Sequence, residues 1–333
     1  MKLLILLLLA TTTFSCSSVK ERPSEIRFDS ELSGYSYPFP VQYFHFNSQN
    51  QEMKMAYMDI SPENPKDTYV LFHGKNFSGY YFKDFIDFFV SKNFRVIVID
   101  QVGFGKSTKP KNYQFSFQSL SENTKKLLSS LNVSSYRLLG HSMGGMLAIR
   151  HALSFPEEVK SLALINPIGL EDWKTMTSYK SVNELYQGER ANTLDKAREY
   201  QRISYYDGKW ENRYDELLIP LKGWLNGEDK DLIAWNAALT SDMIFTQPVI
   251  YEVKNLKMPV VLINGTRDRT AIGRAWASPE NQKRMGQYQE LGKKFKALNT
   301  RVKLIELPGL GHMPFYEAPK TFWDASSKAL LFK

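Results

Sequence analysis

The residues best suited to chemistry form the sequence G-H-S-M-G at residues 140–144, which matches the pattern G-x-S-x-G. This spacing predicts a serine on a sharp turn between a strand and a helix, where a glycine on each side admits close backbone contacts. A strand-like run at 136–139 precedes the motif, and a helix-like run at 146–149 follows it. The alternative is a tight turn without catalysis. We interpret Ser142 as a nucleophile exposed at the carboxyl end of a strand.

A serine hydroxyl needs a base to accept its proton, and histidine is the usual base. The sequence has five histidines, which are His45, His73, His141, His151 and His312. His141 adjoins the serine, so its side chain should point away from the site. His45, His73 and His151 are most simply structural. We predict His312 as the base, because it follows the last expected strand in a loop between glycine and proline. The alternative is a loop histidine with a purely structural hydrogen bond.

The base needs a carboxylate that orients it and stabilises its protonated form. Asp268 follows the expected strand at 260–263 and gives the chain order Ser, Asp, His. The alternative is a surface turn in which Asp268 pairs with Arg267 or Arg269. Asp242 is a rival acid, but it falls inside a helical insertion.

The negative oxygen that forms during acyl transfer needs two amide donors. We expect the backbone N–H of Met143, directly after the nucleophile, to be one of them. The second should come from the loop after His73-Gly74, with Lys75 N–H as first choice and Asn76 as second.

The rest of the chain alternates between strand-like and helix-like segments. Apolar runs typical of buried strands lie at 41–46, 53–60, 69–72, 94–99, 136–139, 162–165, 260–263 and 302–307. Helical spacing of apolar residues lies at 80–92, 119–131, 143–153 and 319–332. Such alternation favours a mostly parallel sheet with helices on both faces.

One region, residues 169–253, lacks a good buried strand and predicts several amphipathic helices inserted between two core strands. Its aromatic residues should form a lid and part of an acyl pocket, although most are expected only to pack the lid on the core. They are Trp173, Tyr179, Tyr186, Tyr200, Tyr205, Tyr206, Trp210, Trp224 and Trp235. We therefore expect a core at 39–168 and 254–333, and a helical cap at 169–253. Residues 279–300 read as a charged helix outside the core.

The amino terminus reads as an export signal. Residues 1–15 have one lysine and then an apolar run too short to span a bilayer, as in a secretory signal. The sole cysteine, Cys16, follows at once, and the segment resembles a bacterial lipoprotein signal in which this cysteine is lipidated. Residues 16–38 would then be a tether. The alternatives are simple secretion, or a buried first strand.

Composition removes several classes of protein. The 333 residues are 43% hydrophobic and 14% aromatic, too much for a disordered chain. One cysteine excludes an internal disulfide and a zinc site built on several cysteines. The formal net charge is +8, but lysine and arginine are scattered, so we expect no nucleic-acid partner.

Taken together, the ordered motifs resemble the α/β-hydrolase superfamily over about residues 40–333. They are H-G at 73–74, D-Q-V-G-F-G-K-S at 100–107, G-H-S-M-G-G at 140–145, Gly265 with Asp268, and G-H at 311–312. The helical insertion is similar to that of the capped branch of serine esterases and meta-cleavage-product hydrolases. The resemblance implies an α/β-hydrolase fold with a helical lid, and a structural role for the loop at 100–107. A serine in place of an aspartate nucleophile argues against dehalogenases and many epoxide hydrolases.

We therefore expect a serine hydrolase that cleaves a carboxylic ester, or another activated acyl bond such as a ketone-adjacent C–C bond, through an acyl-enzyme on Ser142. The site residues would be Ser142, Asp268 and His312, with the Met143 and Lys75 amides as oxyanion donors. We expect no cofactor and no metal, a small-molecule acyl substrate, and export to a periplasmic or cell-surface location with a lipid on Cys16. The alternatives are an acyltransferase or perhydrolase with the same residues, and a non-catalytic surface-binding lipoprotein. The sequence leaves the oligomeric state open.

Overall fold

A computed structural model describes residues 25–332. The predicted export signal and Cys16 lie outside the described residues. No helix within the described part of the chain is long and apolar enough to cross a membrane.

An eight-stranded sheet forms the centre of the molecule, in the order β1-β2-β4-β3-β5-β6-β7-β8. The first strand pairs antiparallel with the second, and the second pairs antiparallel with the fourth, while all other pairs are parallel. The strands are β1 Val41–Ser48, β2 Gln51–Ile60, β3 Thr68–Phe72, β4 Arg95–Ile99, β5 Tyr136–His141, β6 Val159–Ile165, β7 Val260–Gly265 and β8 Val302–Leu307. The predicted strands and the mostly parallel sheet are thus confirmed. The prediction is possible because strands of a parallel sheet are buried on both faces and so read as continuous apolar runs.

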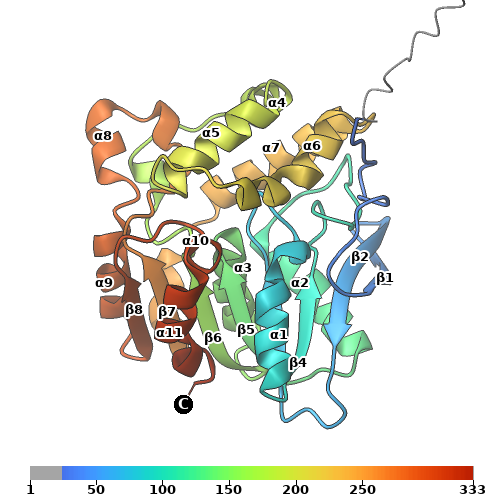
Figure 1. The fold of residues 1–333 in the computed structure, drawn as a ribbon, viewed down its shortest axis with the longest axis vertical. Coiled ribbons are helices and arrows are strands. Elements are labelled where there is room, and N and C mark those ends of the chain that lie inside the picture. The colour runs from blue at the N-terminus through green and yellow to red at the C-terminus, as the bar shows by residue number, and fades with distance from the viewer. Residues whose placement is uncertain (1–24, 333) are drawn as a thin grey trace, which may run out of the picture.

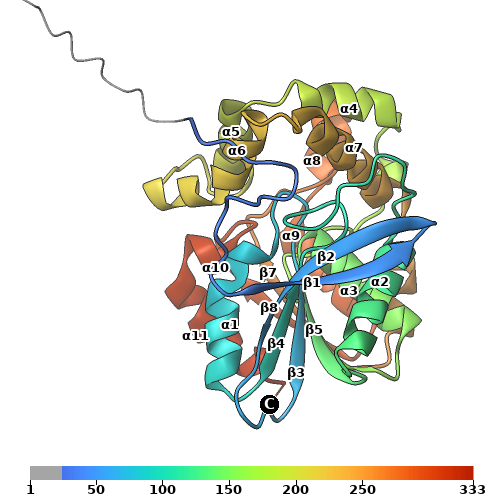
Figure 2. The ribbon, with the colours of Figure 1, turned by 90° about the vertical axis from the view of Figure 1, so that its right-hand side faces the viewer.

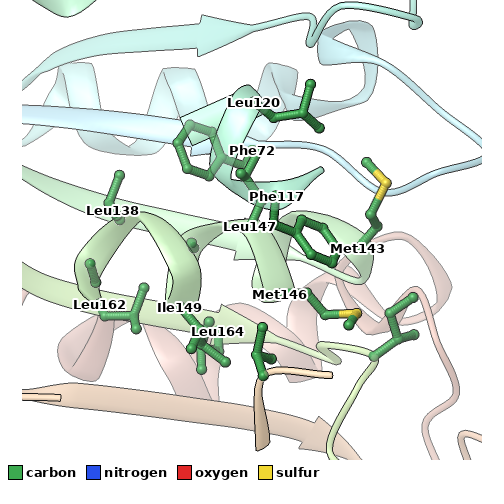
Figure 3. Packing of buried hydrophobic residues seen from close by; sticks show 14 of the residues in the cluster. Phe72, Phe117, Leu120, Leu138, Met143, Met146, Leu147, Ile149, Leu162 and Leu164 are labelled. Carbon is green, nitrogen blue, oxygen red and sulfur yellow. The ribbon is translucent and has the colours of Figure 1, made fainter. Parts of the chain in front are cut away.

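Helices cover both faces of this sheet (Figure 1). On one face lie α2 (Phe117–Ser130), α3 (Met143–Ser154) and α9 (Tyr288–Leu298), and on the other lie α1 (Lys83–Ser91) and α11 (Pro319–Leu330). Figure 3 shows the first of these two cores, where Phe117, Leu120 and Leu147 pack near Leu138 and Leu164 of the sheet. Full burial of these side chains stabilises the fold by roughly 1.5–3 kcal/mol each.

The segment 279–300 differs from the expectation of a charged helix outside the core. It forms the short α8 (Pro279–Arg284) and then α9, whose Tyr288, Leu291 and Phe295 are buried in the core. These three residues follow helical spacing on one face, which the many charged neighbours obscure in the sequence.

A layer of helices lies above the carboxyl ends of the strands (Figure 1). It contains α4 (Val182–Arg190), α5 (Leu194–Ser204), α6 (Ile219–Leu225) and α7 (Lys230–Thr246), and we call it the cap. Ser181 and Glu184 form a reciprocal capping box at the start of α4, which satisfies the exposed amides of its first turn. Short 3-10 turns and α10 complete the chain, at η1 Gly79–Phe82, η2 Trp173–Thr175, η3 Asn212–Leu218, η4 Ile250–Asn255, η5 Arg274–Trp276 and α10 Pro314–Glu317.

Residues 25–37, which we call the strap, belong to the folded body, although the sequence suggested a tether over this stretch. Phe28 N–H donates to Gly223 O at 3.0 Å, and Trp224 Nε1 donates to Asp29 O at 3.0 Å. At its other end, Tyr37 Oη donates to Asp100 at 2.6 Å. The strap passes beside α6 on its way to β1 (Figure 2) and so joins the cap to the core.

Candidate active site

Ser142 lies at a strained turn between β5 and α3. Its φ of 57° and ψ of −122° fall where a residue with a side chain is rarely found, and holding it there costs on the order of 1–3 kcal/mol. Two glycines make the turn possible. A Cβ on Gly140 would lie 2.3 Å from Gly144 O, and a Cβ on Gly144 would lie 2.1 Å from Phe72 O.

The structure brings the three predicted side chains together. His312 Nε2 lies 2.9 Å from Ser142 Oγ, and His312 Nδ1 lies 2.7 Å from Asp268 Oδ2. All three residues are buried, and the aspartate is fully inaccessible. The hydroxyl can therefore donate to the imidazole while the imidazole donates to the carboxylate, which is the geometry of an activated nucleophile.

Asp268 is held by further donors. Asn166 Nδ2 donates to Asp268 Oδ2 at 2.8 Å, and the Thr270 N–H donates to Oδ1 at 2.8 Å. Burial alone would raise the pKa of the Asp268 carboxyl. Attraction to His312 and the hydrogen bonds from His312 and Thr270 outweigh that burial and lower the pKa. Asp268 therefore remains a carboxylate that orients His312.

The loop after β3 lies directly against the nucleophile. A Cβ on Gly74 would lie 3.1 Å from Ser142 Cβ. The strand order reverses at β3 and β5, and in such sheets the crevice at the carboxyl ends of these strands is the usual ligand site. In the described structure Lys75 N–H donates no hydrogen bond. Met143 is the first residue of α3, so its N–H has no acceptor within the helix. The role of these two amides as oxyanion donors stays a prediction.

His141 has a role that sequence reasoning missed. Its Nε2 donates to His312 O at 3.0 Å, and its Nδ1 accepts from Tyr81 Oη at 2.9 Å. Tyr81 Oη in turn accepts from Gly74 N–H at 2.9 Å. Burial, followed by repulsion from His312, lowers the pKa of His141 to about 3, so it stays neutral. The side chain thus links the loop that carries the base to the loop that carries Lys75.

The other predicted candidates lie elsewhere. Asp242 accepts from Tyr179 Oη at 2.9 Å on the cap and does not contact His312. His73 is fully buried, and its Nε2 accepts from Gln101 N–H at 3.2 Å, which is a structural role. His151 is buried between Ser121 and Tyr136. Among residues 25–332 no cluster of metal-ligating side chains is present.

A cavity of about 730 Å³ lies between Ser142 and the cap. Of the nine cap aromatics, Tyr200, Tyr205 and Trp224 line it, whereas the others pack within the cap or against the core. The ring of Tyr205 lies 4.7 Å from the ring of His312, so it covers the base from above. Lys75 Nζ pairs with Glu189 of α4 at 3.0 Å and ties the loop after β3 to the cap.

Comparison with known proteins agrees with this geometry. The model of the alpha/beta hydrolase fold family matches residues 68–319, and the chain belongs to that family. A crystal structure described as a probable hydrolytic enzyme from Pseudomonas aeruginosa PAO1 is 43% identical, with a TM-score of 0.89, and the match covers 92% of this chain and 98% of that one. An esterase from Thermogutta terrifontis shares the fold at a TM-score of 0.64 and 18% identity, covering 87% of this chain and 98% of that one.

Two curated relatives show the range of chemistry in the family. A 1-acylglycerol-3-phosphate O-acyltransferase of Arabidopsis thaliana is 25% identical over 86% of this chain and 71% of that protein. A cis-3-alkyl-4-alkyloxetan-2-one decarboxylase of Shewanella oneidensis is 30% identical over 67% of this chain and 73% of that protein. The family match over residues 68–319 and the 43% identical probable hydrolytic enzyme support an esterase-like enzyme of the α/β-hydrolase superfamily, in its capped branch.

Proposed function

We propose that the protein hydrolyses a carboxylic ester, or a related activated acyl bond, through an acyl-enzyme on Ser142. The observation that carries this proposal is the pair of hydrogen bonds at His312, which accepts from Ser142 Oγ at 2.9 Å and donates to Asp268 Oδ2 at 2.7 Å. The strained turn presents the serine oxygen to the cavity beneath the cap.

In this mechanism Ser142 Oγ attacks the acyl carbon while His312 Nε2 takes the hydroxyl proton. The carbonyl oxygen becomes an oxyanion that accepts from Met143 N–H and Lys75 N–H. As the carbon–oxygen bond breaks, His312 returns the proton to the leaving alcohol, and the acyl group stays on the serine. Water then gives its proton to His312, attacks the acyl-enzyme and releases the acid, after which the proton returns to Ser142.

A fluorophosphonate probe tests the nucleophile. We expect the intact mass of protein lacking residues 1–16 to rise by one probe adduct, and the Ser142→Ala variant to stay unlabelled. An adduct that persists in Ser142→Ala, or the absence of an adduct on folded wild-type protein, would overturn the proposal.

Acyl transfer is a second candidate, because the rice and Arabidopsis acyltransferases are 25% identical to this chain over 86% of its length. The same acyl-enzyme would pass its acyl group to an alcohol instead of water. Product analysis with a competing alcohol distinguishes the two, since a transferase forms the new ester in preference to the free acid.

We further propose export and lipidation at Cys16, supported by the sequence of residues 1–16. Radioactive palmitate should label the full chain but not its Cys16→Ser variant. A secreted protein that carries no label would overturn lipidation and keep export.

A further inference from the structure

Two arginines, Arg269 and Arg274, are among the residues that line the cavity, and both lie on the loop after Asp268. Arg269 directly follows Asp268, and Arg274 begins η5 after Gly273, whose φ of 84° fixes the turn. Within residues 25–332 neither side chain has a carboxylate within 4.0 Å, whereas the neighbouring Arg267 pairs with Glu317.

Backbone carbonyls fix both side chains without neutralising them. Arg269 Nη1 donates to Asp268 O at 2.6 Å and to Thr266 O at 3.1 Å. Arg274 Nε donates to Gln282 O at 2.9 Å, and its Nη1 donates to Arg269 O at 3.3 Å. A guanidinium carries five N–H donors in a planar fork, so each side chain keeps donors for a further acceptor.

The cavity wall offers no ready counter-charge for this pair. The acidic residues that line it are Glu189, which pairs with Lys75, and Glu184, which accepts from Ser181 at the start of α4. Lys180, Lys196 and Lys230 also line the cavity, and Lys180 lies 4.3 Å from the ring of Trp276 in η5. Arg274 Nη1 reaches Arg269 O at 3.3 Å, so the two cations are close together. Burial and then repulsion from Arg274 lower the pKa of Arg269, although attraction to Asp268 opposes them.

The cavity wall under α6 and α7 has a different chemistry. It is mostly apolar, with Lys230, Thr240 and Ser241 of α7 as its polar members, and its apolar residues are Leu217, Leu218, Leu221, Trp224, Leu225 and Ile233. A wall of this kind favours a hydrocarbon chain, and the cavity as a whole therefore suits a molecule with an apolar part and an anionic part.

We propose that Arg269 and Arg274 form a subsite that binds an anionic group of the substrate, and that the substrate is an amphiphilic acyl ester. Its phosphate or carboxylate group would lie on the two guanidiniums, while its acyl chain would lie under α6 and α7. This inference rests on the proposed ester hydrolysis at Ser142 and names the substrate class for it.

The kinetic test compares a monoacylglycerol with the same acyl chain on glycerol 3-phosphate. We expect the ratio of kcat/KM for the anionic ester to that for the neutral ester to fall about tenfold in Arg274→Gln, mainly through KM, because a charge-assisted hydrogen bond is lost. Arg274→Lys should recover part of the ratio. The matched control is Arg284→Gln, which removes the same charge from the exposed side of α8 and should leave the ratio unchanged.

A purely structural role for Arg274 predicts a different result. Loss of the loop contacts would lower kcat/KM for both esters alike, leave the ratio unchanged, and make Arg274→Lys as poor as Arg274→Gln. That outcome would overturn the subsite. In wild-type protein, added salt should raise KM for the anionic ester only, and an equal effect on both esters would contradict the proposal without any variant.

Binding to Ser142→Ala separates this inference from the catalytic proposal. Calorimetry should show tighter binding of the anionic ester than of the neutral one, and weak binding of glycerol 3-phosphate or inorganic phosphate alone. Inorganic phosphate that binds as tightly as the ester would make this a site for free phosphate. If Ser142 resists the fluorophosphonate while the anionic ester still binds, the hydrolytic mechanism fails and the subsite stands.

Discussion

At the scale of single residues, the backbone at Ser142 is held in place by its neighbours rather than by its own preference. The positive φ of this residue is maintained because Gly140 and Gly144 let three backbone segments meet beneath it. Such strain places the hydroxyl at the tip of the turn, where His312 reaches it.

We therefore predict that Gly144→Ala disrupts the site. Its methyl group would lie 2.1 Å from Phe72 O, so β3 or α3 must shift, at a cost on the order of 1–3 kcal/mol in stability. Urea unfolding and fluorophosphonate labelling measure the two effects. Gly188→Ala in α4 is the control, because nothing lies within 4 Å of its Cβ, and it should stabilise the protein by up to about 1 kcal/mol. Full labelling of Gly144→Ala would contradict this account of the turn.

A second prediction at this scale concerns acid. Burial, with repulsion from Lys125, lowers the pKa of His151 from 6.5 to about 3. Between these pH values the unfolded chain binds a proton that the folded chain does not, so stability is present above about pH 6.5 and falls as the pH drops. Each such histidine contributes up to about 1.4 kcal/mol per pH unit.

His151→Gln should therefore be less stable than wild type at neutral pH but lose stability less steeply on acidification. Chemical denaturation across the acid range measures the slope. The exposed His45 of β1 supplies the control His45→Gln, whose profile should follow wild type. A slope in His151→Gln as steep as that of wild type would refute the assignment.

The sequence could identify Ser142, Asp268 and His312 because each follows a recognisable strand, and parallel strands end at one edge of a sheet. The link made by His141 could not be predicted in this way. Its contacts to Tyr81 and to His312 O join segments 60 and 171 residues away, and no local pattern marks them.

At the scale of elements, the core helices and strands follow from periodicity, whereas the cap does not. Helical spacing predicts that the cap is helical, but it cannot tell Tyr205, which covers His312, from Tyr206, which stacks on Tyr214 at 3.7 Å. Both are aromatic, buried and adjacent in sequence. Only the packing of the cap on the core distinguishes the roles of these two tyrosines. The burial of α9 is equally hard to predict, because lysines alternate with its apolar residues in the sequence.

The contact of α6 with the strap gives a prediction for these elements. A Cβ on Gly223 would lie 2.0 Å from the ring of Phe28, so Gly223→Ala should loosen the strap and cost about 1–3 kcal/mol. In a Phe28→Ala background the same glycine change should cost little, because the ring that it strikes is gone. Thermal unfolding of the four proteins measures the coupling. Additive effects would mean that the two residues do not meet.

At the scale of the whole molecule, the strap contacts both the cap and the core before the chain enters β1. Ser30 N–H donates to Asp229 of the cap at 2.7 Å, while the buried Lys106 of the core donates to Leu32 O. Removing the strap would therefore free the cap and remove the hydrogen bond from Lys106, which contributes about 1 kcal/mol.

We predict that a chain starting at Val41 is less stable than one starting at Glu25 by more than about 3 kcal/mol, since several hydrogen bonds and the packing of Phe28, Tyr35 and Tyr37 are lost together. The packing is visible as edge contacts of Tyr35 with Phe28 and Tyr80 at 5.6 and 5.5 Å. Urea unfolding compares the two chains, and fluorophosphonate labelling reports the site in each. Because the sheet, Ser142 and His312 lie outside the strap, the shorter chain should still label when folded, but its cap should be cleaved sooner by protease. Equal unfolding midpoints and equal cleavage would mean that the strap lies on the surface without holding the cap.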